Sequence, residues 1–397
     1  GDVLHSRPAV VNYGGSIGVV VYYGANDGLY RAINGNRSAN ISNSGNTVTV
    51  RPGGELWSFV APEFLDQFPR QFNDDPAIRF PNTPASSNAE LRDYFFDGTT
   101  TFFQDSRTTG ATAGDKYLYL SARRGGRLLY AMNVTDPMAP TVMWKLTTTQ
   151  LPELGFTWSQ PKVTKIGGRG RPVLIFGAGN APEQDADPVA AADTMGRGIV
   201  ILDGITGKII WAALNNCAAV PAASFSTSGT EGVVGVCVTN SALTSAFPAD
   251  ITLLDRDGDG FTDRLYAADV ASNIWRVDLD PSDSTNIYVN PVPTTPASEI
   301  ILTKFATLGG SGNNARKMLY PPDVVPTEGF DLVVASTGDR EHPLFNGSAT
   351  AGTAHNVQNR FYMLIDPNEG ASAAGFTAIV DSDLLNQTTL TCFNSSD

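Results

Sequence analysis

Apolar residues along this chain form short blocks of four to eight, or alternate with polar residues, and turns containing Gly, Asn or Asp separate them. Such blocks are typical of half-buried or central β-strands. Because each unit of this kind is a small antiparallel sheet that needs neighbours to bury its faces, the repetition predicts an all-β protein of the β-propeller type. The paired blocks lie at residues 18–34, 116–137, 160–180 continued by 196–214, 250–279, and 321–341 continued by 360–367.

Long polar insertions separate these units, and they exceed the length of turns within a propeller blade, so we expect decorating loops. Residues 54–68 depart from the strand pattern, and Pro62 followed by EFLDQF predicts a short helix with proline near its first turn. We interpret residues 1–397 as a single propeller domain. The insertions are 35–54, 73–90, 105–115, 181–195, 215–249 and 343–359.

The composition and net charge of the chain exclude several classes of function. With 42% hydrophobic and 17% charged residues, the chain can bury a sizeable core. Its net charge of −13 disfavours nucleic-acid binding, which needs a basic surface. No run of 18 apolar residues occurs, so no integral membrane span is expected. The opening residues do not resemble a signal peptide, and we expect a fragment of a longer secreted protein.

Three cysteines are present, Cys217, Cys237 and Cys392. The first two bracket a polar stretch of small residues, which predicts a surface hairpin, within the insertion 215–249, closed by a disulfide in an oxidising compartment. Two buried free thiols are the alternative. The sequence does not identify a partner for Cys392.

The segment DRDGDGFTD carries the clearest chemical signal. Asp255, Asp257, Asp259 and Asp263 occupy its first, third, fifth and ninth positions, and this spacing follows the calcium-loop pattern. Gly260 permits the sharp turn, and the backbone carbonyl of Phe261, in seventh place, would supply another oxygen. Hard oxygen ligands on a flexible loop suit Ca²⁺ better than Mg²⁺.

Two features distinguish this loop from an EF-hand. Its twelfth position is Tyr266 rather than a bidentate Glu, and its flanks are predicted to be strands rather than helices. We therefore expect an EF-hand-like calcium site on a β-hairpin, with a dissociation constant of about micromolar to millimolar. A solvated acidic turn is the alternative. The sequence leaves open whether the ion regulates the protein or only stabilises a blade.

Signals for catalysis are weak, and we expect that the protein is not an enzyme. No nucleophile elbow occurs, and the three histidines lack metal-ligand spacing. One segment favours a different function, that of a quinone-dependent enzyme. Asp203 to Trp211, within ILDGITGKIIWAAL, resembles the tryptophan-docking repeat of quinoprotein propellers. Adjacent cysteines beside a quinone are absent from the sequence, so we interpret the segment as propeller architecture without the cofactor.

The order of motifs resembles the C-terminal propeller of type IV pilus tip proteins of the PilC/PilY type. The calcium loop followed by LYAADVASNIWRVDL is the most distinctive element, and the resemblance runs from about residue 3 to residue 366. The other motifs, in order, are VLHSRPAVV, YYGANDGLYRAIN, GELWSFVAPEFL, YFFDGT, LLYAMNVTDP, GFTWSQPKV, VLIFGAGN and DGITGKIIW.

The resemblance implies a modified, seven-bladed, quinoprotein-like propeller at the bacterial cell surface, pilus tip, outer membrane or periplasm. It implies that calcium at residues 255–263 controls pilus extension against retraction, with roles in adhesion and twitching motility. Pilins, minor pilins and host or abiotic surfaces would be the partners. A quinone-dependent dehydrogenase and a purely structural, calcium-stabilised extracellular propeller are the alternatives.

Overall fold

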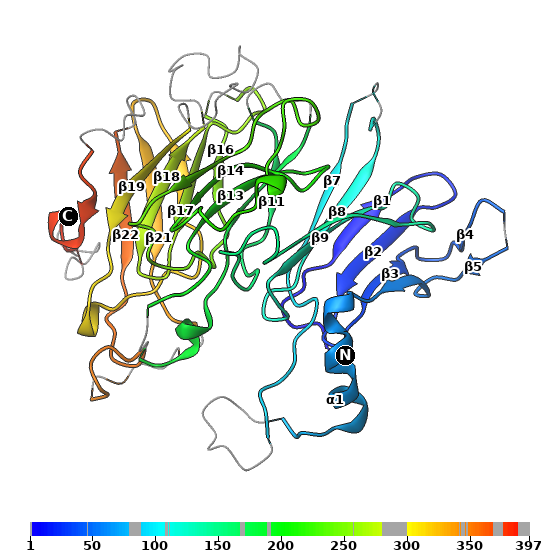
Figure 1. The fold of residues 1–397 in the computed structure, drawn as a ribbon, viewed down its shortest axis with the longest axis horizontal. Helices are drawn as coiled ribbons and strands as arrows, with labels where there is room; N and C mark the ends of the chain where they lie inside the picture. The colour runs from blue at the N-terminus through cyan, green and yellow to red at the C-terminus, as the bar shows by residue number, and fades with distance from the viewer. Residues whose placement is uncertain are drawn as a thin grey trace, which may run out of the picture.

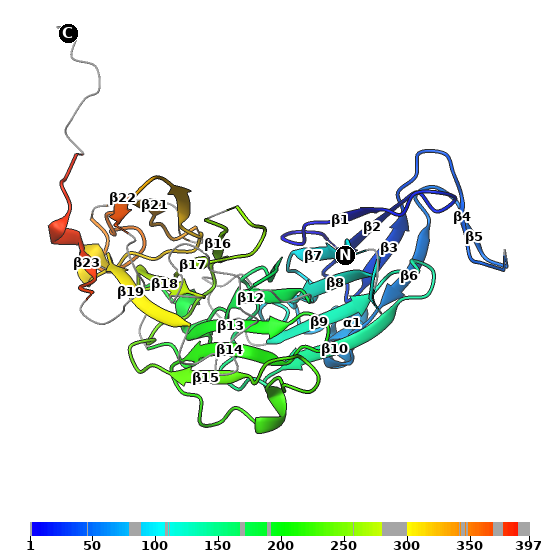
Figure 2. The ribbon, with the colours of Figure 1, turned by 90° about the horizontal axis from the view of Figure 1, so that it is seen from above.

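A computed structural model shows the chain as a series of β-sheets that follow one another in an arc (Figure 1). Figure 2 shows the blue first sheet and the orange fifth sheet at opposite ends of this arc. The structure describes residues 2–45, 47–78, 89–107, 110, 112–166, 171–188, 192–256, 258–279, 300–340, 342, 346, 348–367 and 376–387.

Five sheets of three to five strands form the body, and nearly all neighbouring strands within them are antiparallel. The first sheet contains β1 (Ala9–Asn12), β2 (Val19–Gly24), β3 (Tyr30–Asn34) and β6 (Glu55–Phe59). The second contains β7 (Thr100–Gln104), β8 (Lys116–Ser121), β9 (Leu128–Asn133) and β10 (Thr141–Thr147). The third contains β11 (Lys162–Thr164), β12 (Val173–Gly177), β13 (Gly198–Asp203), β14 (Ile209–Leu214) and β15 (Val236–Thr239).

The fourth sheet contains β16 (Thr252–Leu254), β17 (Arg264–Ala268), β18 (Asn273–Asp278), β19 (Ile301–Thr307) and β23 (Ile379–Val380). The fifth contains β20 (Asp323–Pro326), β21 (Asp331–Ser336) and β22 (Phe361–Asp366). A separate ribbon pairs β4 (Ile41–Ser42) with β5 (Thr49–Val50). The helices are short: η1 (Pro62–Gln67), α1 (Phe68–Asn73), η2 (Pro182–Asp185), η3 (Ala222–Ser224), η5 (Gly312–Asn314) and η6 (Asp381–Asp383).

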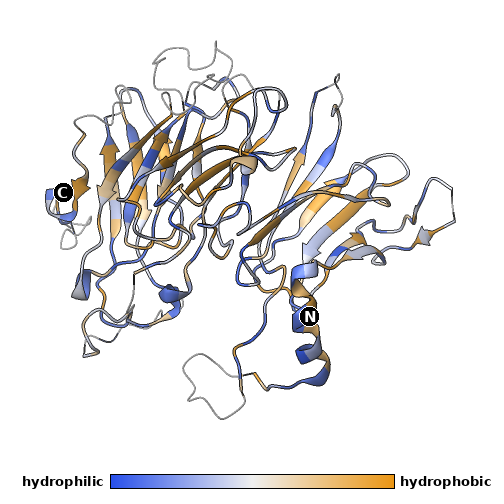
Figure 3. Ribbon diagram, in the orientation of Figure 1, coloured by the Kyte–Doolittle hydropathy of each residue, from blue (hydrophilic) through white to orange (hydrophobic). Residues whose placement is uncertain are grey.

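The hydrophobic core is divided into four main clusters, and each cluster fills the space between two successive sheets. Between the third and fourth sheets, for example, Trp211 packs in the same cluster as Leu265 and Trp275. Apolar residues accordingly concentrate on the strands (Figure 3). Since each sheet depends on its neighbours for burial, the predicted all-β propeller-type architecture is confirmed.

Two details differ from the sequence prediction, the number of sheets and the structure of the segment 54–68. The described residues form five sheets of three or more strands, whereas the resemblance implies seven blades. The segment 54–68 was expected to lie outside the strands, but Glu55–Phe59 is β6, whose half-buried residues lack clear alternation. The predicted helix follows it, with Pro62 at the start of η1.

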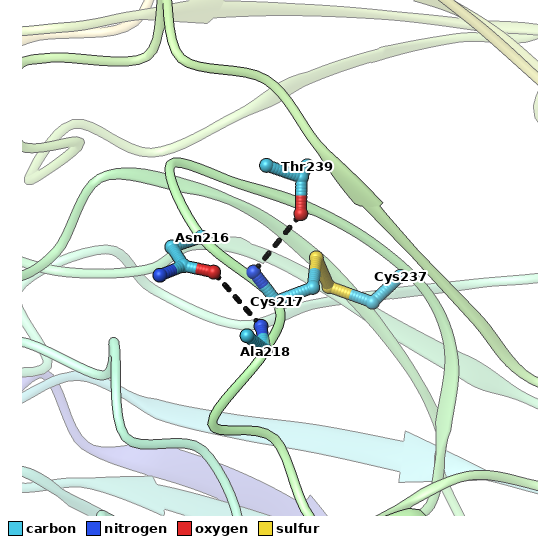
Figure 4. Close-up of a disulfide and its surroundings, with 5 residues drawn as sticks. All are labelled: Asn216, Cys217, Ala218, Cys237 and Thr239. Atoms are coloured by element: carbon cyan, nitrogen blue, oxygen red, sulfur yellow. Dashed lines mark hydrogen bonds between the residues drawn. A yellow bond between two sulfur atoms is a disulfide. The ribbon is translucent and has the colours of Figure 1, made fainter.

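The insertion 215–249 is more than a decorating loop, because its residues 236–239 form β15 and extend the third sheet. β15 runs parallel to β14, so the two cysteines do not lie on a simple hairpin. The chain between these strands is long enough to make the crossover that a parallel pair needs. A disulfide joins Cys217 to Cys237, with 5.9 Å between their Cα atoms (Figure 4).

Removing this disulfide should destabilise the third sheet. By loop-closure arguments, we expect Cys237→Ser to lower the free energy of unfolding by about 3 kcal/mol, because the bridge closes a loop with a sequence separation of 20 residues. Urea denaturation followed by tryptophan fluorescence measures the change. Cys392→Ser is the control, and an unchanged midpoint for Cys237→Ser would show that the bridge does not constrain the unfolded chain.

Candidate metal centre

The acidic loop connects two strands of the fourth sheet. β16 ends at Leu254 and β17 begins at Arg264, and these two residues pair, so the loop comprises residues 255–263. The Asp263 N–H donates to the carbonyl oxygen of Leu254 at 2.8 Å, which closes the loop at its base. The predicted β-hairpin setting of the loop is therefore confirmed.

The described carboxylates of the loop accept hydrogen bonds from its own backbone. Asp255 accepts hydrogen bonds from the N–H groups of Gly258 (2.8 Å) and Gly260 (2.9 Å). The carboxylate of Asp259 accepts one from the N–H of Phe261 at 2.8 Å. Gly258 and Gly260 have φ angles of 79° and 90°, a left-handed conformation that favours glycine. The backbone thus folds around the first aspartate.

Asp263, in ninth place, is buried although it is charged, with 4% of its surface exposed. Its Oδ2 accepts a hydrogen bond of 2.5 Å from the N–H of Arg256. Asp255 and Asp259 remain exposed at the surface. One end of the loop is therefore fixed in the protein, while the carboxylates of its first and fifth positions are open to solvent.

The donor set fits a hard cation in its chemistry. A carboxylate oxygen that accepts one N–H retains lone pairs, so these hydrogen bonds leave capacity for an ion. Asp257 lies outside the described residues. Among the residues that the structure does describe, no group of three or more His, Cys, Asp or Glu side chains could hold a metal ion. Calcium binding at residues 255–263 therefore stays a prediction from the sequence.

The loop contacts the third sheet through Thr262. Its N–H donates to the carbonyl oxygen of Lys165 at 2.8 Å, and its hydroxyl lies 2.7 Å from that of Thr164 at the end of β11. Thr262 is buried, so these bonds are shielded from water. The base of the loop is therefore hydrogen-bonded to the edge of the third sheet.

The loop contacts the fifth sheet through Arg256, its second residue. The guanidinium Nε donates to Oδ1 of Asp331, the first residue of β21, at 3.0 Å. Its Nη2 donates to the carbonyl oxygen of Thr327, in the turn before β21, at 3.2 Å. A single loop thus connects the fourth sheet to both of its neighbours.

Asp331 belongs to a buried network between the fourth and fifth sheets. Its Oδ2 accepts hydrogen bonds from Arg264 (2.8 Å) and from the hydroxyl of Tyr266 (3.3 Å). The same tyrosine hydroxyl lies 2.7 Å from Asp366 in β22. Asp331 and Asp366 are fully buried. The network therefore holds two strands of the fifth sheet against the fourth.

Two further residues close the network within the fourth sheet. Asp278 accepts hydrogen bonds from Arg264 (2.6 Å) and Arg276 (2.9 Å), and Arg276 also donates to Asp366. Burial alone would lower the pKa of Arg264, but the attraction of Asp278 raises this pKa above its ordinary value. Burial raises the pKa of Tyr266 well above its usual range. Arg264 therefore remains charged and Tyr266 remains neutral.

Sequence reasoning identified the aspartates of the loop but missed Arg256 and its partner Asp331. The available signal was a charged residue directly before the apolar run LVVA in the segment DLVVAS, which becomes β21. A buried carboxylate in such a strand requires a partner. However, the sequence does not say that the partner lies 75 residues earlier in the calcium-loop segment.

The quinoprotein-like segment takes part in packing. Trp211 lies on β14 with none of its surface exposed. The carboxylate of Asp203 accepts hydrogen bonds from the N–H groups of Ile205 and Thr206, which shapes the turn before β14. These contacts explain the segment as a strand–turn–strand unit of the third sheet.

The chain is similar in sequence to proteins of known name. No family model matches the chain. It is 23% identical to the type IV pilus biogenesis factor PilY1 of Pseudomonas aeruginosa strain UCBPP-PA14, over 98% of this chain and 31% of that protein. A PilY1 homologue of Xylella fastidiosa is 25% identical over 65% of this chain and 16% of its own length. The chain thus spans less than a third of these relatives.

The fold has a counterpart among solved structures. The C-terminal domain of Pseudomonas aeruginosa PilY1 superposes with a TM-score of 0.53 and 18% identity, over 89% of this chain and 67% of that domain. Together, sequence and fold support a C-terminal domain of the PilY1 type, and the resemblance seen in the motifs is confirmed. Within the described part of the chain, no helix has the length and apolar character needed to cross a membrane.

The buried network should be important for stability. Asp331→Asn keeps the shape of the side chain but removes the charge that compensates Arg256 and Arg264. Breaking such a network should lower the free energy of unfolding by about 3–5 kcal/mol. The control is Asp323→Asn on exposed β20, where we expect a change within about 0.5 kcal/mol. Urea denaturation measures both, and equal midpoints would contradict the role of Asp331.

Proposed function

We propose that this chain is the calcium-binding propeller domain of a type IV pilus biogenesis factor, and that it acts by binding and conformational change rather than by catalysis. One observation carries the proposal. A nine-residue acidic loop with calcium-site spacing joins three sheets of a chain that is similar over 98% of its length to proteins named as pilus biogenesis factors. These relatives are named for biogenesis and not for an enzymatic activity.

In this proposal, the carboxylates of Asp255, Asp257, Asp259 and Asp263 and the carbonyl oxygen of Phe261 hold Ca²⁺. The ion would neutralise the repulsion among four neighbouring carboxylates, which otherwise opposes a compact loop. The loop glycines support this role, because their left-handed backbone allows the chain to curl around the first aspartate. Asp263 would fix one side of the site, since its Oδ2 is held by the N–H of Arg256.

Arg256 provides the route from the loop to the rest of the domain. Its N–H contacts Asp263 inside the loop, and its guanidinium contacts Asp331 in the fifth sheet. Ordering the loop around an ion would therefore position the Arg256 side chain. Because Asp331 also binds Arg264 and Tyr266, this position would bias the packing of the fifth sheet against the fourth. Two arrangements of this interface would give partners a calcium-dependent surface.

Pilins or minor pilins would recognise this surface, and the long inserted loops would bind host or abiotic surfaces. We place the protein at the cell surface, at the pilus tip, in the outer membrane or in the periplasm. Calcium would then shift the balance between pilus extension and retraction, and so affect adhesion and twitching motility.

A purely structural role for the ion is the second candidate, because a loop tied to three sheets would also act as a staple. The two roles differ in their consequences. A structural ion raises the melting temperature strongly, by the linkage of binding to folding, without changing pilus behaviour. A regulatory ion changes pilus behaviour at concentrations near its dissociation constant.

The calcium site can be tested by titration calorimetry on the 397-residue chain. We expect one saturable site with a dissociation constant of about micromolar to millimolar. Asp259→Ala should weaken binding at least about tenfold, because it removes a charged oxygen ligand. Asp323→Ala, an exposed aspartate on β20, is the control and should bind as the unmodified chain does. Absence of binding at millimolar calcium would contradict the proposed function.

The regulatory role can be tested in cells that carry Asp255→Ala in the full-length protein. We expect pilus number and twitching distance to lose their dependence on external calcium, because the loop no longer responds to the ion. Electron microscopy and motility assays measure these quantities, and immunoblotting confirms equal protein levels. Normal pili and twitching in a variant that has lost calcium binding would leave only the structural role.

A further inference from the structure

One arginine of the fifth sheet has no carboxylate partner in the part of the chain that the structure describes. Arg340 is exposed and lies in the turn after β21. Its guanidinium carbon lies 5.3 Å from the ring centroid of Trp158 and 5.5 Å from that of Tyr320. Two aromatic rings therefore hold a planar cation in place, while its N–H groups remain available to an acceptor.

Two further arginines contact the same indole ring, but both have acidic partners. The guanidinium carbons of Arg123 and Arg124, in the turn between β8 and β9, lie 4.2 Å and 4.7 Å from the ring centroid of Trp158. Arg123 pairs with Asp97 at 3.5 Å, and Arg124 pairs with Asp185 at 3.1 Å. The arginine after β21 adds a third positive charge around this ring, so an anion bound to it would offset the repulsion.

Arg340 lines a cavity at the end of the fifth sheet. The cavity has a volume of about 280 Å³, and Tyr320 and Asn359 also line it. A second cavity of about 320 Å³ adjoins the first and extends to Asp187, beyond η2. The two cavities share the residues Asp339, Ala354, Val357 and Asn359. Sites for small molecules have volumes of about 300–1,000 Å³, so the adjoining cavities have the size of such a site.

Hydrogen bonds fix the walls of these cavities. Nζ of Lys317 donates to Oδ2 of Asp339 at 2.8 Å and to the carbonyl oxygen of Gln184, in η2, at 2.9 Å. The N–H of Ala354 donates to the carboxylate of Asp187 at 2.7 Å. These bonds join the loops of the fifth sheet to the segment that follows β12. The walls are therefore in place before a ligand arrives, which lowers the entropic cost of binding.

The first cavity offers a second kind of donor. Oδ1 of Asn359 accepts a hydrogen bond from the hydroxyl of Thr337 at 3.2 Å. This bond leaves the NH₂ group of the side chain to donate, and no described residue accepts from it. The ring of Tyr320 is also accessible, because this residue is 55% exposed. The cavity thus combines a guanidinium, an amide donor and an aromatic ring.

The charges around the cavity favour a carboxylate over a phosphate. A guanidinium can bind either group through two parallel hydrogen bonds. However, the carboxylate of Asp339 lines the same cavity, where it contacts Lys317 and lies 3.2 Å from Nδ1 of His342. This carboxylate would repel a doubly charged phosphate more strongly than a singly charged carboxylate.

We propose that this cavity is a binding site for a small organic acid. The guanidinium of Arg340 holds the carboxylate through two parallel hydrogen bonds, while Asn359 and Tyr320 contact the rest of the molecule. The site is separate from the acidic loop, since β21 begins at Asp331 beside that loop and ends at Ser336 in the wall of the cavity. The proposal therefore does not rest on calcium binding.

Fluorine NMR of the 397-residue chain tests the site, with para-fluorobenzoate as the probe. The control probe is para-fluorobenzamide, which has nearly the same shape but no charge. We expect saturable broadening of the benzoate signal, no saturable broadening of the benzamide signal, and displacement of the benzoate by acetate. Equal binding of the two probes, or no saturable binding of millimolar benzoate, would overturn the proposal. Stronger displacement by inorganic phosphate than by acetate would indicate a general anion site and would also overturn it.

Substitution of the arginine tests its role. Arg340→Gln should weaken benzoate binding at least about tenfold, because it removes two hydrogen bonds between charged groups. Arg340→Lys keeps the charge but loses the planar fork, so its affinity should lie between the two. Arg51→Gln, at an exposed arginine before β6, changes the net charge equally and should leave the affinity unchanged. Equal affinities of Arg340→Gln and the unmodified chain would overturn the proposal.

A second substitution tests the cavity without altering the arginine. Asn359→Asp keeps the shape of an exposed side chain but places a negative charge in the cavity wall, so benzoate binding should be lost. Near-UV circular dichroism and the denaturation midpoint check that the fold is retained. Unchanged affinity in a folded variant would contradict the proposed site.

Discussion

The carboxylate of Asp331 is the interaction on which the arrangement around the acidic loop depends. It is fully buried and accepts hydrogen bonds from Arg256 in the loop and from Arg264 and Tyr266 in β17. An isolated buried carboxylate is costly, so Asp331 is tolerated only while these donors stay in place. The loop, the fourth sheet and the fifth sheet are therefore linked by one charge.

This constraint gives the loop a structural role between the fourth and fifth sheets. Sheets of a propeller are joined mainly by apolar contacts, which are not directional and tolerate small shifts. The contact between Arg256 and Asp331 is directional and partly buried, and the contact between Arg276 and Asp366 is directional and fully buried, so both help to orient the fifth sheet on the fourth. The loop is thus in direct contact with the fifth sheet, whose opposite face is apolar and exposed.

Local features of the fold could be predicted from the sequence, and non-local ones could not. The segment 18–34 predicts a hairpin, and it forms β2 and β3 around a turn at Gly28. The sequence predicts a sharp turn at Gly260, which lacks a side chain. In the structure the backbone of Gly260 is left-handed, as such a turn requires. Both conclusions depend only on neighbouring residues.

The missed features depend on residues far apart in the chain. The sequence predicts a loop where β15 forms, because its partner β14 is separated from it by the long crossover that contains Cys217. The link from Arg256 to Asp331 spans 75 residues and two sheets. β6 is missed for a different reason, since its residues are exposed or half-buried and show no regular alternation.

The central claim is that the loop and the fifth sheet respond together to calcium. Hydrogen–deuterium exchange of the 397-residue chain, with calcium and with a chelator, tests it most directly. We predict that calcium slows amide exchange in residues 255–263 and also in β21, at Asp331–Ser336, while β8 in the distant second sheet is unchanged. A response confined to residues 255–263, with β21 unaffected, would contradict the coupling through Arg256 and Asp331.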